Sequence, residues 1–171
     1  FIDPAVGSGI FLRTILETQL ENIAQETTID KVRATIQKAY GIDLDENAAQ
    51  ATKLSLSLLH LVLTDELPSQ LNVFSGEAIE FFQYHQEYSE MFDAVIANPP
   101  FISLDTQEPA MRQRIGEFMN EFGSGRMDMY LAFLRIGIEL LKPGGYGLFV
   151  LPHSFLITKS AKKMREYLTN S

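Results

Sequence analysis

Apolar residues fall into two alternating patterns along the chain. Short β-prone runs occupy 1–2, 39–43, 71–74, 92–97 and 146–151. Between them, apolar residues recur at the three- and four-residue spacing of amphipathic helices, and these predicted helices are 10–24, 29–38, 45–62, one through 81–82, 108–122, 127–141 and 154–168. Strands that alternate with helices predict an α/β domain with a mostly parallel sheet and helices on both faces.

Composition narrows the class of protein. The chain has 171 residues, 46% of them hydrophobic, which suits one domain with one sizeable core. Cysteine is absent and the three histidines are scattered, so the sequence predicts no disulfide framework and no metal site. It contains neither a secretory signal nor an apolar run long enough for a membrane helix, which agrees with a cytoplasmic location.

Charge is uneven along the chain. The net charge is −8, and residues 1–100 hold 5 Lys and Arg against 15 Asp and Glu. Contacts with phosphate groups come mainly from Lys and Arg, so an acidic chain would need other segments to supply much of its binding to a nucleic acid. The basic residues of the second half either cover solvated faces or contribute to that binding. They include Arg112, Arg114, Arg126, Lys159, Lys162 and Lys163.

The segment 3–9, Asp-Pro-Ala-Val-Gly-Ser-Gly, follows the first predicted strand and precedes the first helix. Gly7 and Gly9 allow a tight turn and a close approach of ligand to backbone. The following helix N-terminus offers unpaired N–H groups to a negative group. The third glycine of the dinucleotide fingerprint is missing, because position 12 is Leu, so a nicotinamide dehydrogenase is disfavoured.

Two acidic residues follow the next strands. Asp43 ends the second predicted strand, where a carboxylate can accept both hydroxyls of a ribose. Asp45 is predicted instead to cap the following helix. Glu77, after the third strand, either faces the base of a cofactor or begins a helix, because acids favour a first helical turn.

The segment 94–101 runs from the fourth strand into Asn-Pro-Pro-Phe. Proline cannot donate to a sheet ladder, so Pro99 and Pro100 end the strand. Asn98 is then left at the carboxyl edge of the sheet, where ligands bind in open α/β folds. The polar, Gly-containing stretch 102–125 that follows is long for a loop, as lids and binding loops often are.

These motifs together resemble the amino-group DNA methyltransferases, with the cofactor motif before the catalytic motif. The segment 3–12 resembles their cofactor-binding motif, 41–45 their acidic motif and 98–101 their catalytic motif. The block 128–156 is similar to adenine-specific methylases of restriction-modification and phage-defence systems, above all the Eco57I-like proteins that join methylase and endonuclease in one chain. The resemblance covers nearly the whole chain.

The resemblance implies a Rossmann-like class I methyltransferase fold, S-adenosylmethionine (SAM) as cofactor, no metal, and transfer of a methyl group to N6 of a flipped-out adenine in DNA. The implied catalytic residues are Asn98, Pro99, Pro100 and Phe101. The implied cofactor residues are Asp3, Pro4, Ala5, Gly7, Gly9, Asp43, Leu44, Glu77 and Asn98. Glu77 departs from the commoner Asp of the family, and Val6 replaces a frequent Cys.

We therefore expect residues 1–171 to be the catalytic domain of a longer protein, truncated at both ends, with the target-recognition domain and any endonuclease elsewhere. Alone, it is expected to bind DNA weakly and to have little activity. Same-fold alternatives are methylation of cytosine N4, of RNA or of a protein glutamine. An alternative from another class is a non-catalytic SAM-binding module of a defence complex.

Overall fold

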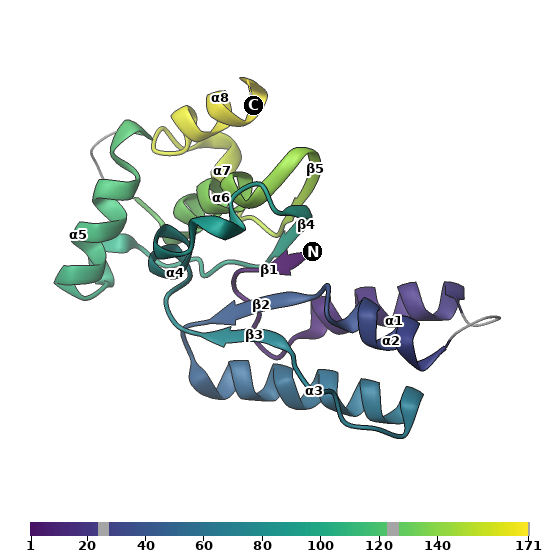
Figure 1. The fold of residues 1–171 in the computed structure, drawn as a ribbon. Coiled ribbons are helices and arrows are strands. Elements are labelled where there is room, and N and C mark those ends of the chain that lie inside the picture. Colours follow the sequence, from purple (N-terminus) through teal and green to yellow (C-terminus); the bar gives the residue numbers. More distant parts are fainter. Residues whose placement is uncertain (24–27, 123–126, 171) are drawn as a thin grey trace.

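The computed structural model describes residues 1–23, 28–122 and 127–170, and it contains one five-stranded sheet (Figure 1). The strand order is β3-β2-β1-β4-β5, and every pair of neighbouring strands is parallel. The predicted α/β class is therefore confirmed. The strands are β1 (Ile2–Asp3), β2 (Tyr40–Asp43), β3 (Asn72–Ser75), β4 (Phe92–Ala97) and β5 (Leu141–Phe149).

Helices cover both faces of the sheet, each over its own hydrophobic core (Figure 1). One core joins the sheet to α1 (Ile10–Ile23), α2 (Ile29–Ile36) and α3 (Glu46–Thr64). The other joins it to α4 (Ala78–Tyr84), α5 (Pro109–Phe118) and α6 (Met129–Leu140). Short 3-10 turns lie at η1 (Gln86–Tyr88), η2 (Leu104–Thr106) and η3 (Asn120–Phe122).

The strand order reverses between β1 and β4. From β1 the chain moves outward through β2 to β3, whereas β4 pairs with the other side of β1 and leads to β5. The loops after β1 and β4 therefore diverge and leave a crevice at the carboxyl edge of the sheet. Ligands of open α/β sheets bind at such a switch point.

The predicted start of the last strand was wrong. Helix α6 ends at Leu140, close to its predicted end, but β5 begins at Leu141 rather than at Tyr146. Phe92 pairs with Leu141 and Ala94 pairs with Tyr146, so residues 142–145 form an irregularity within the strand. Gly144 has a φ of 80°, a left-handed conformation that glycine adopts without strain. The Pro-Gly-Gly segment that resembles a helix stop is also a bulge of the sheet.

The predicted helix 154–168 is two helices, α7 (Ser154–Ile157) and α8 (Lys162–Asn170). The Arg165 guanidinium in α8 donates hydrogen bonds to the backbone oxygens of Phe155 and Thr158, at 2.6 and 3.1 Å. These bonds satisfy carbonyl groups that a helix end leaves open. Two other predicted helices were too long: 108–122 contains α5 and η3, and 29–38 ends at Ile36.

Within the three described ranges, no helix combines the length and apolar character needed to cross a membrane.

Candidate functional site

The loop after β1 is a tight turn held by backbone hydrogen bonds. Val6 N donates to the Ile42 oxygen at 3.0 Å, and Gly9 N donates to the Val6 oxygen at 2.9 Å. Gly7 and Gly9 have φ angles of 55° and 78°, in the left-handed region. Glycine enters this region without the steric cost of a Cβ atom. These two residues thus allow the turn that brings the chain from β1 into α1.

Asp3 ends β1 with its carboxyl group inside the protein, where the residue is only 2% exposed. Its Oδ1 accepts a hydrogen bond from Ala5 N at 2.9 Å. Burial, with a smaller effect from the nearby Asp43, raises the pKa of Asp3 to about 7 although the Ala5 bond opposes the rise. Asp3 is therefore a carboxyl group that ionises near neutral pH.

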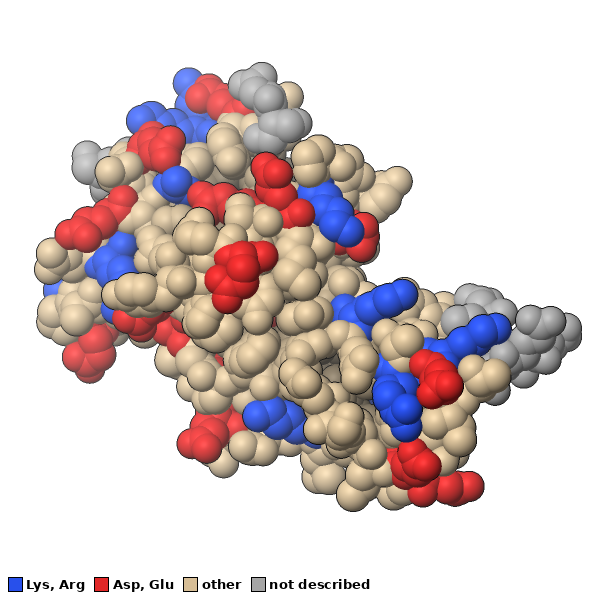
Figure 2. Space-filling model, in the orientation of Figure 1, with Lys and Arg blue, Asp and Glu red and all other residues tan. Residues whose placement is uncertain are grey.

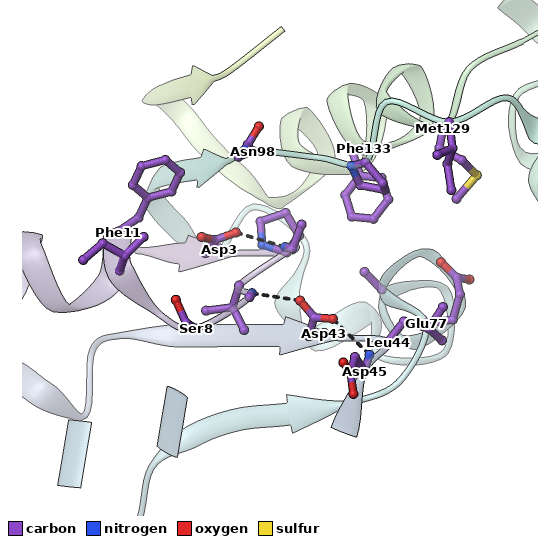
Figure 3. Close-up of a pocket in the computed structure, with 18 of the residues that line it drawn as sticks. Asp3, Ser8, Phe11, Asp43, Leu44, Asp45, Glu77, Asn98, Met129 and Phe133 are labelled. Carbon is purple, nitrogen blue, oxygen red and sulfur yellow. Dashed lines mark hydrogen bonds between the residues drawn. The ribbon is translucent and has the colours of Figure 1, made fainter. Parts of the chain in front are cut away.

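Asp43 ends β2 and binds two backbone N–H groups. Its Oδ2 accepts from Gly7 N at 2.8 Å, and its Oδ1 accepts from Asp45 N at 3.0 Å. The carboxylate therefore joins the end of β2 to the glycine loop (Figure 3). Asp45 accepts from Asn47 N at 2.9 Å, which confirms it as the cap of α3.

Glu77 caps α4. Its carboxylate accepts from Ile79 N at 2.9 Å and from Glu80 N at 2.8 Å, and its Oε2 lies 3.7 Å from Nη2 of Arg114 in α5. Of the two interpretations of Glu77, the helix start is confirmed. Glu77 is also one of the residues that line the cavity described below.

Asn98 directly follows β4 and is exposed to solvent. Among the described residues, its side chain has no hydrogen-bond partner. Pro99 is buried, whereas Phe101 is 49% exposed and its ring meets Tyr130 edge-on with centroids 6.3 Å apart. The backbone here is also tied to β5, because Val150 N donates to the Ala97 oxygen at 2.9 Å. Asn98 thus presents a free amide on a corner that is held from both sides.

A cavity of about 630 Å³ lies where these elements meet, at the ends of neighbouring strands (Figure 3). Its volume falls within the range of small-molecule sites. Nine of the predicted residues line it: Asp3, Pro4, Ala5, Gly7, Asp43, Leu44, Glu77, Asn98 and Pro100. The other three, Gly9, Pro99 and Phe101, lie outside its walls.

The sequence did not predict the apolar wall of this cavity. Met129 and Phe133 enter it from α6, and Ile10 and Phe11 from the start of α1 (Figure 3). Ile102, Gln107 and Met111 line it from the predicted binding loop. The sequence feature that could have indicated Met129 and Phe133 is the almost wholly apolar character of α6. A helix that is buried on every side can also contribute side chains to a ligand cavity.

No group of three or more His, Asp or Glu side chains in the described residues could hold a metal ion.

Solved structures share this fold. The chain superposes on a cryo-EM structure of a DrdV–DNA complex with a TM-score of 0.73 and 16% identity, covering 99% of this chain and 19% of that one. It also superposes on a candidate class I S-adenosylmethionine-dependent methyltransferase of Listeria monocytogenes, with a TM-score of 0.62 and 18% identity over 99% and 44% of the two chains. The class I methyltransferase fold is thereby confirmed.

Sequence comparison identifies relatives and a family. The type II restriction enzyme and methyltransferase RM.Eco57I of Escherichia coli is 24% identical over 220 aligned residues. This alignment covers all of the present chain but 21% of the Escherichia coli protein, so the chain spans about a fifth of that relative's length. The model of the Eco57I restriction-modification methylase family matches residues 37–171, most of the chain. The chain therefore belongs to the Eco57I restriction-modification methylase family.

Proposed function

We propose that the protein containing this chain transfers a methyl group from SAM to N6 of adenine in DNA. The observation that carries the proposal is the free amide of Asn98 on the wall of a cavity that also holds Asp3 and Asp43. An amide without a protein partner can accept from a substrate amino group, and the two carboxyl groups suit a cofactor with an ammonium group and a ribose.

The residues fit SAM, the cofactor that the family and the fold imply. We assign its ammonium group to Asp3, directly or through water, and its ribose to Asp43. We assign its methionine portion to the backbone of Gly7 and Ser8, which line the cavity, whereas Gly9 allows the turn behind them. The nearby apolar side chains suit a flat aromatic base. They are Leu44, Ala78, Met129 and Phe133. When bound, SAM supplies a methyl group activated by a sulfonium centre.

Glu77 can meet the cofactor's base only through the acceptor capacity that α4 leaves free. Its two oxygens already accept from Ile79 N and Glu80 N. A carboxylate has about four lone-pair positions, so each oxygen can accept a further hydrogen bond. Asp43 is in the same situation, because Gly7 N and Asp45 N hold its oxygens at fixed positions. We infer that both carboxylates are oriented before the cofactor binds, which lowers the entropy lost on binding.

The catalytic chemistry rests on two acceptors. The lone pair of an adenine amino group is delocalised into the ring, so the amine is a weak nucleophile. The Asn98 side-chain oxygen and the Pro99 backbone oxygen can each accept one of its N–H groups, which favours a tetrahedral nitrogen and stabilises developing positive charge. A nitrogen–carbon bond forms, the carbon–sulfur bond breaks and one amino proton leaves to solvent. Neither a metal nor a covalent enzyme intermediate is part of this mechanism.

The adenine must leave the duplex to reach Asn98, at a cost of a few kcal/mol. We propose that Phe101 stacks on it, and the support is that Phe101 is 49% exposed next to Asn98-Pro99-Pro100. Tyr130 beneath Phe101 is buried and packs edge-on against Phe155 as well, with centroids 6.2 Å apart. We therefore infer that the contact with Tyr130 supports the Phe101 ring, while its exposed part remains available to a base.

DNA is the proposed partner, and the segment after β5 offers it positive charge. Lys159 and Lys162 are exposed in the segment that follows β5, although Lys162 Nζ also lies 3.6 Å from Glu166 Oε1. This segment begins at Val150, whose N–H donates to the oxygen of Ala97, the residue before Asn98. Lys159→Gln with Lys162→Gln is expected to weaken DNA binding and to reduce the slope of log K against log salt by up to about 0.9 per lysine. Binding measured from 50 to 200 mM salt tests this expectation.

The control pair is Lys31→Gln with Lys38→Gln. These lysines precede β2, at the opposite edge of the sheet from the cavity. Equal loss of affinity and slope in both pairs would mean a general charge effect, and it would refute a local phosphate contact.

We further propose that residues 1–171 are the catalytic methyltransferase domain. DNA recognition and cleavage would then belong to other parts of the same protein or to associated proteins. The support is that the alignment covers only 21% of the length of a relative that is named as both a restriction enzyme and a methyltransferase. Several other basic side chains are engaged within the domain: Arg114 pairs with Glu77 and Glu80, and Arg112 and Lys163 donate to the backbone oxygens of Asp105 and Glu121. On the face shown in Figure 2, basic and acidic side chains are interspersed. Arg126 lies outside the described residues.

The deciding experiment is methyl transfer by the full-length protein from SAM with a labelled methyl group to unmethylated DNA. The DNA is digested to nucleosides and the label is located by mass spectrometry. We expect N6-methyladenine. Label in N4-methylcytosine, in RNA or in protein, or no transfer despite SAM binding, would contradict the proposal.

A further inference from the structure

Thr52 lies in the middle of α3 but bonds outside its own helix. The residue is 0% exposed, and its hydroxyl donates to the Gly7 oxygen at 2.8 Å, across 45 positions of sequence. Threonine within a helix ordinarily bonds the carbonyl one turn earlier. Thr64 of the same helix does so, because its hydroxyl donates to the His60 oxygen at 2.8 Å. The hydroxyl of Thr52 is therefore committed to the glycine loop.

Gly7 is held from two sides as a result. Its N–H donates to Asp43 at the end of β2, and its carbonyl accepts from Thr52 in α3. A trans peptide is planar with its N–H and C=O groups pointing in opposite directions. Fixing the Gly7 carbonyl toward α3 therefore fixes the Ser8 N–H away from α3, in a loop whose Gly7 and Ser8 line the cavity.

The side chain of Thr52 also leaves no room for a side chain at Gly9. A Cβ atom on Gly9 would lie 2.8 Å from both Cγ2 and Oγ1 of Thr52, closer than real Cβ atoms come to such atoms. Gly9 itself is buried outside the cavity wall. Thr52 thus occupies the space behind the loop, and it sets how close the loop comes to α3.

We infer that Thr52 is a positioning residue for the cofactor site, which orients the Gly7–Ser8 peptide and, through Gly7, the carboxylate of Asp43. The inference rests on the proposed SAM site. Thr52 itself does not line the cavity, so its effect on binding must pass through Gly7. Thr52 would thereby influence cofactor affinity, although it belongs to none of the sequence motifs described above.

The test compares three substitutions in the full-length protein. Thr52→Val replaces the hydroxyl with a methyl group of similar size, whereas Thr52→Ser keeps the hydroxyl. Removing one net hydrogen bond predicts about three- to tenfold weaker SAM binding for Val, and close to wild-type binding for Ser. If the Val variant fails to fold, Thr52→Ser and Thr52→Ala can be compared instead, because both only remove atoms. They differ in the hydroxyl group, which serine keeps and alanine lacks. Isothermal titration calorimetry with SAM is the readout.

Methylation kinetics and a control separate positioning from structure. KM for SAM should rise in proportion to the dissociation constant, with kcat little changed. Thr64→Val is the control, since the Thr64 hydroxyl serves the end of α3 and Glu66, and it should lower the melting temperature without changing SAM affinity. Wild-type affinity in Thr52→Val, or equal losses in the Ser and Ala variants, would overturn the inference. Absence of SAM binding by the wild type would instead refute the proposed function.

Discussion

Replacing Asn98 with alanine is expected to lower kcat for methyl transfer by about 10²–10³-fold, the usual effect of removing one preorganised hydrogen-bonding group from a reacting centre. The proposed mechanism gives the Asn98 oxygen one of the two acceptor positions for the adenine amino group. Without it, the Pro99 oxygen alone would stabilise the charge that develops on nitrogen. Single-turnover methylation of DNA by the full-length protein measures the loss.

The fold should survive this substitution. Within the described part of the chain, the Asn98 side chain makes no hydrogen bond, so truncation leaves no protein group unpaired. SAM affinity should therefore change far less than kcat. Asn72→Ala is a matched control, because its side-chain amide donates to the Gln37 oxygen at 2.7 Å at the opposite edge of the sheet. It should alter stability and leave methylation intact.

Asn98→Asp refines the same prediction. A carboxylate still accepts hydrogen bonds, but it adds negative charge to a cavity that already holds Asp3 and Asp43. We expect activity between that of the wild type and Asn98→Ala. Undiminished activity in the alanine variant would exclude Asn98 as an acceptor for the amino group.

Local sequence patterns predicted the parts of the fold that depend on short-range chemistry. Strand β4 has its predicted bounds, because a β-prone run there ends at two prolines that cannot extend it. The glycine loop and the capping role of Asp45 depend on backbone freedom and on a side chain that bonds its own helix. Such signals lie within a few residues of the structure they produce.

Tertiary contacts decided what the sequence could not predict. The break between α7 and α8 is stabilised by Arg165, whose donors reach back to Phe155 and Thr158. The irregular start of β5 appears only when it pairs with β4. Phe133 has the sequence pattern of a core residue, and only the packing of α6 against the sheet edge brings it to the cavity.

The buried carboxyl group of Asp3 predicts a pH-dependent affinity for SAM. The pKa of Asp3 is raised to about 7, so its carboxyl group is increasingly protonated as the pH falls below neutral. An ammonium group binds the ionised form, and SAM binding should therefore release a proton. Between pH 5.5 and 7 an ordinary α-amino group, with a pKa of about 7.7–8.0, stays charged, so Asp3 alone sets the trend. Affinity should rise about tenfold over this interval.

The same group makes folding stability depend on pH in the opposite direction. In the unfolded chain Asp3 ionises near its ordinary pKa of 3.8, whereas in the folded protein it keeps its proton until about pH 7. Between these values the folded state binds more protons, so this contribution to the free energy of unfolding falls as pH rises. Asp3→Asn should remove that fall and raise stability above pH 7, while SAM binding weakens by about 30-fold or more for loss of a buried charge partner.

Calorimetry distinguishes these effects from a general dependence on acidity. SAM titrations at pH 6.5, in buffers with different ionisation enthalpies, give the number of protons released, which should be between zero and one for the wild type and near zero for Asp3→Asn. Asp45→Asn is the control, because Asp45 also borders the cavity and asparagine keeps the α3 cap. An Asp3→Asn variant with wild-type affinity and an unchanged pH profile would show that Asp3 does not meet the ammonium group.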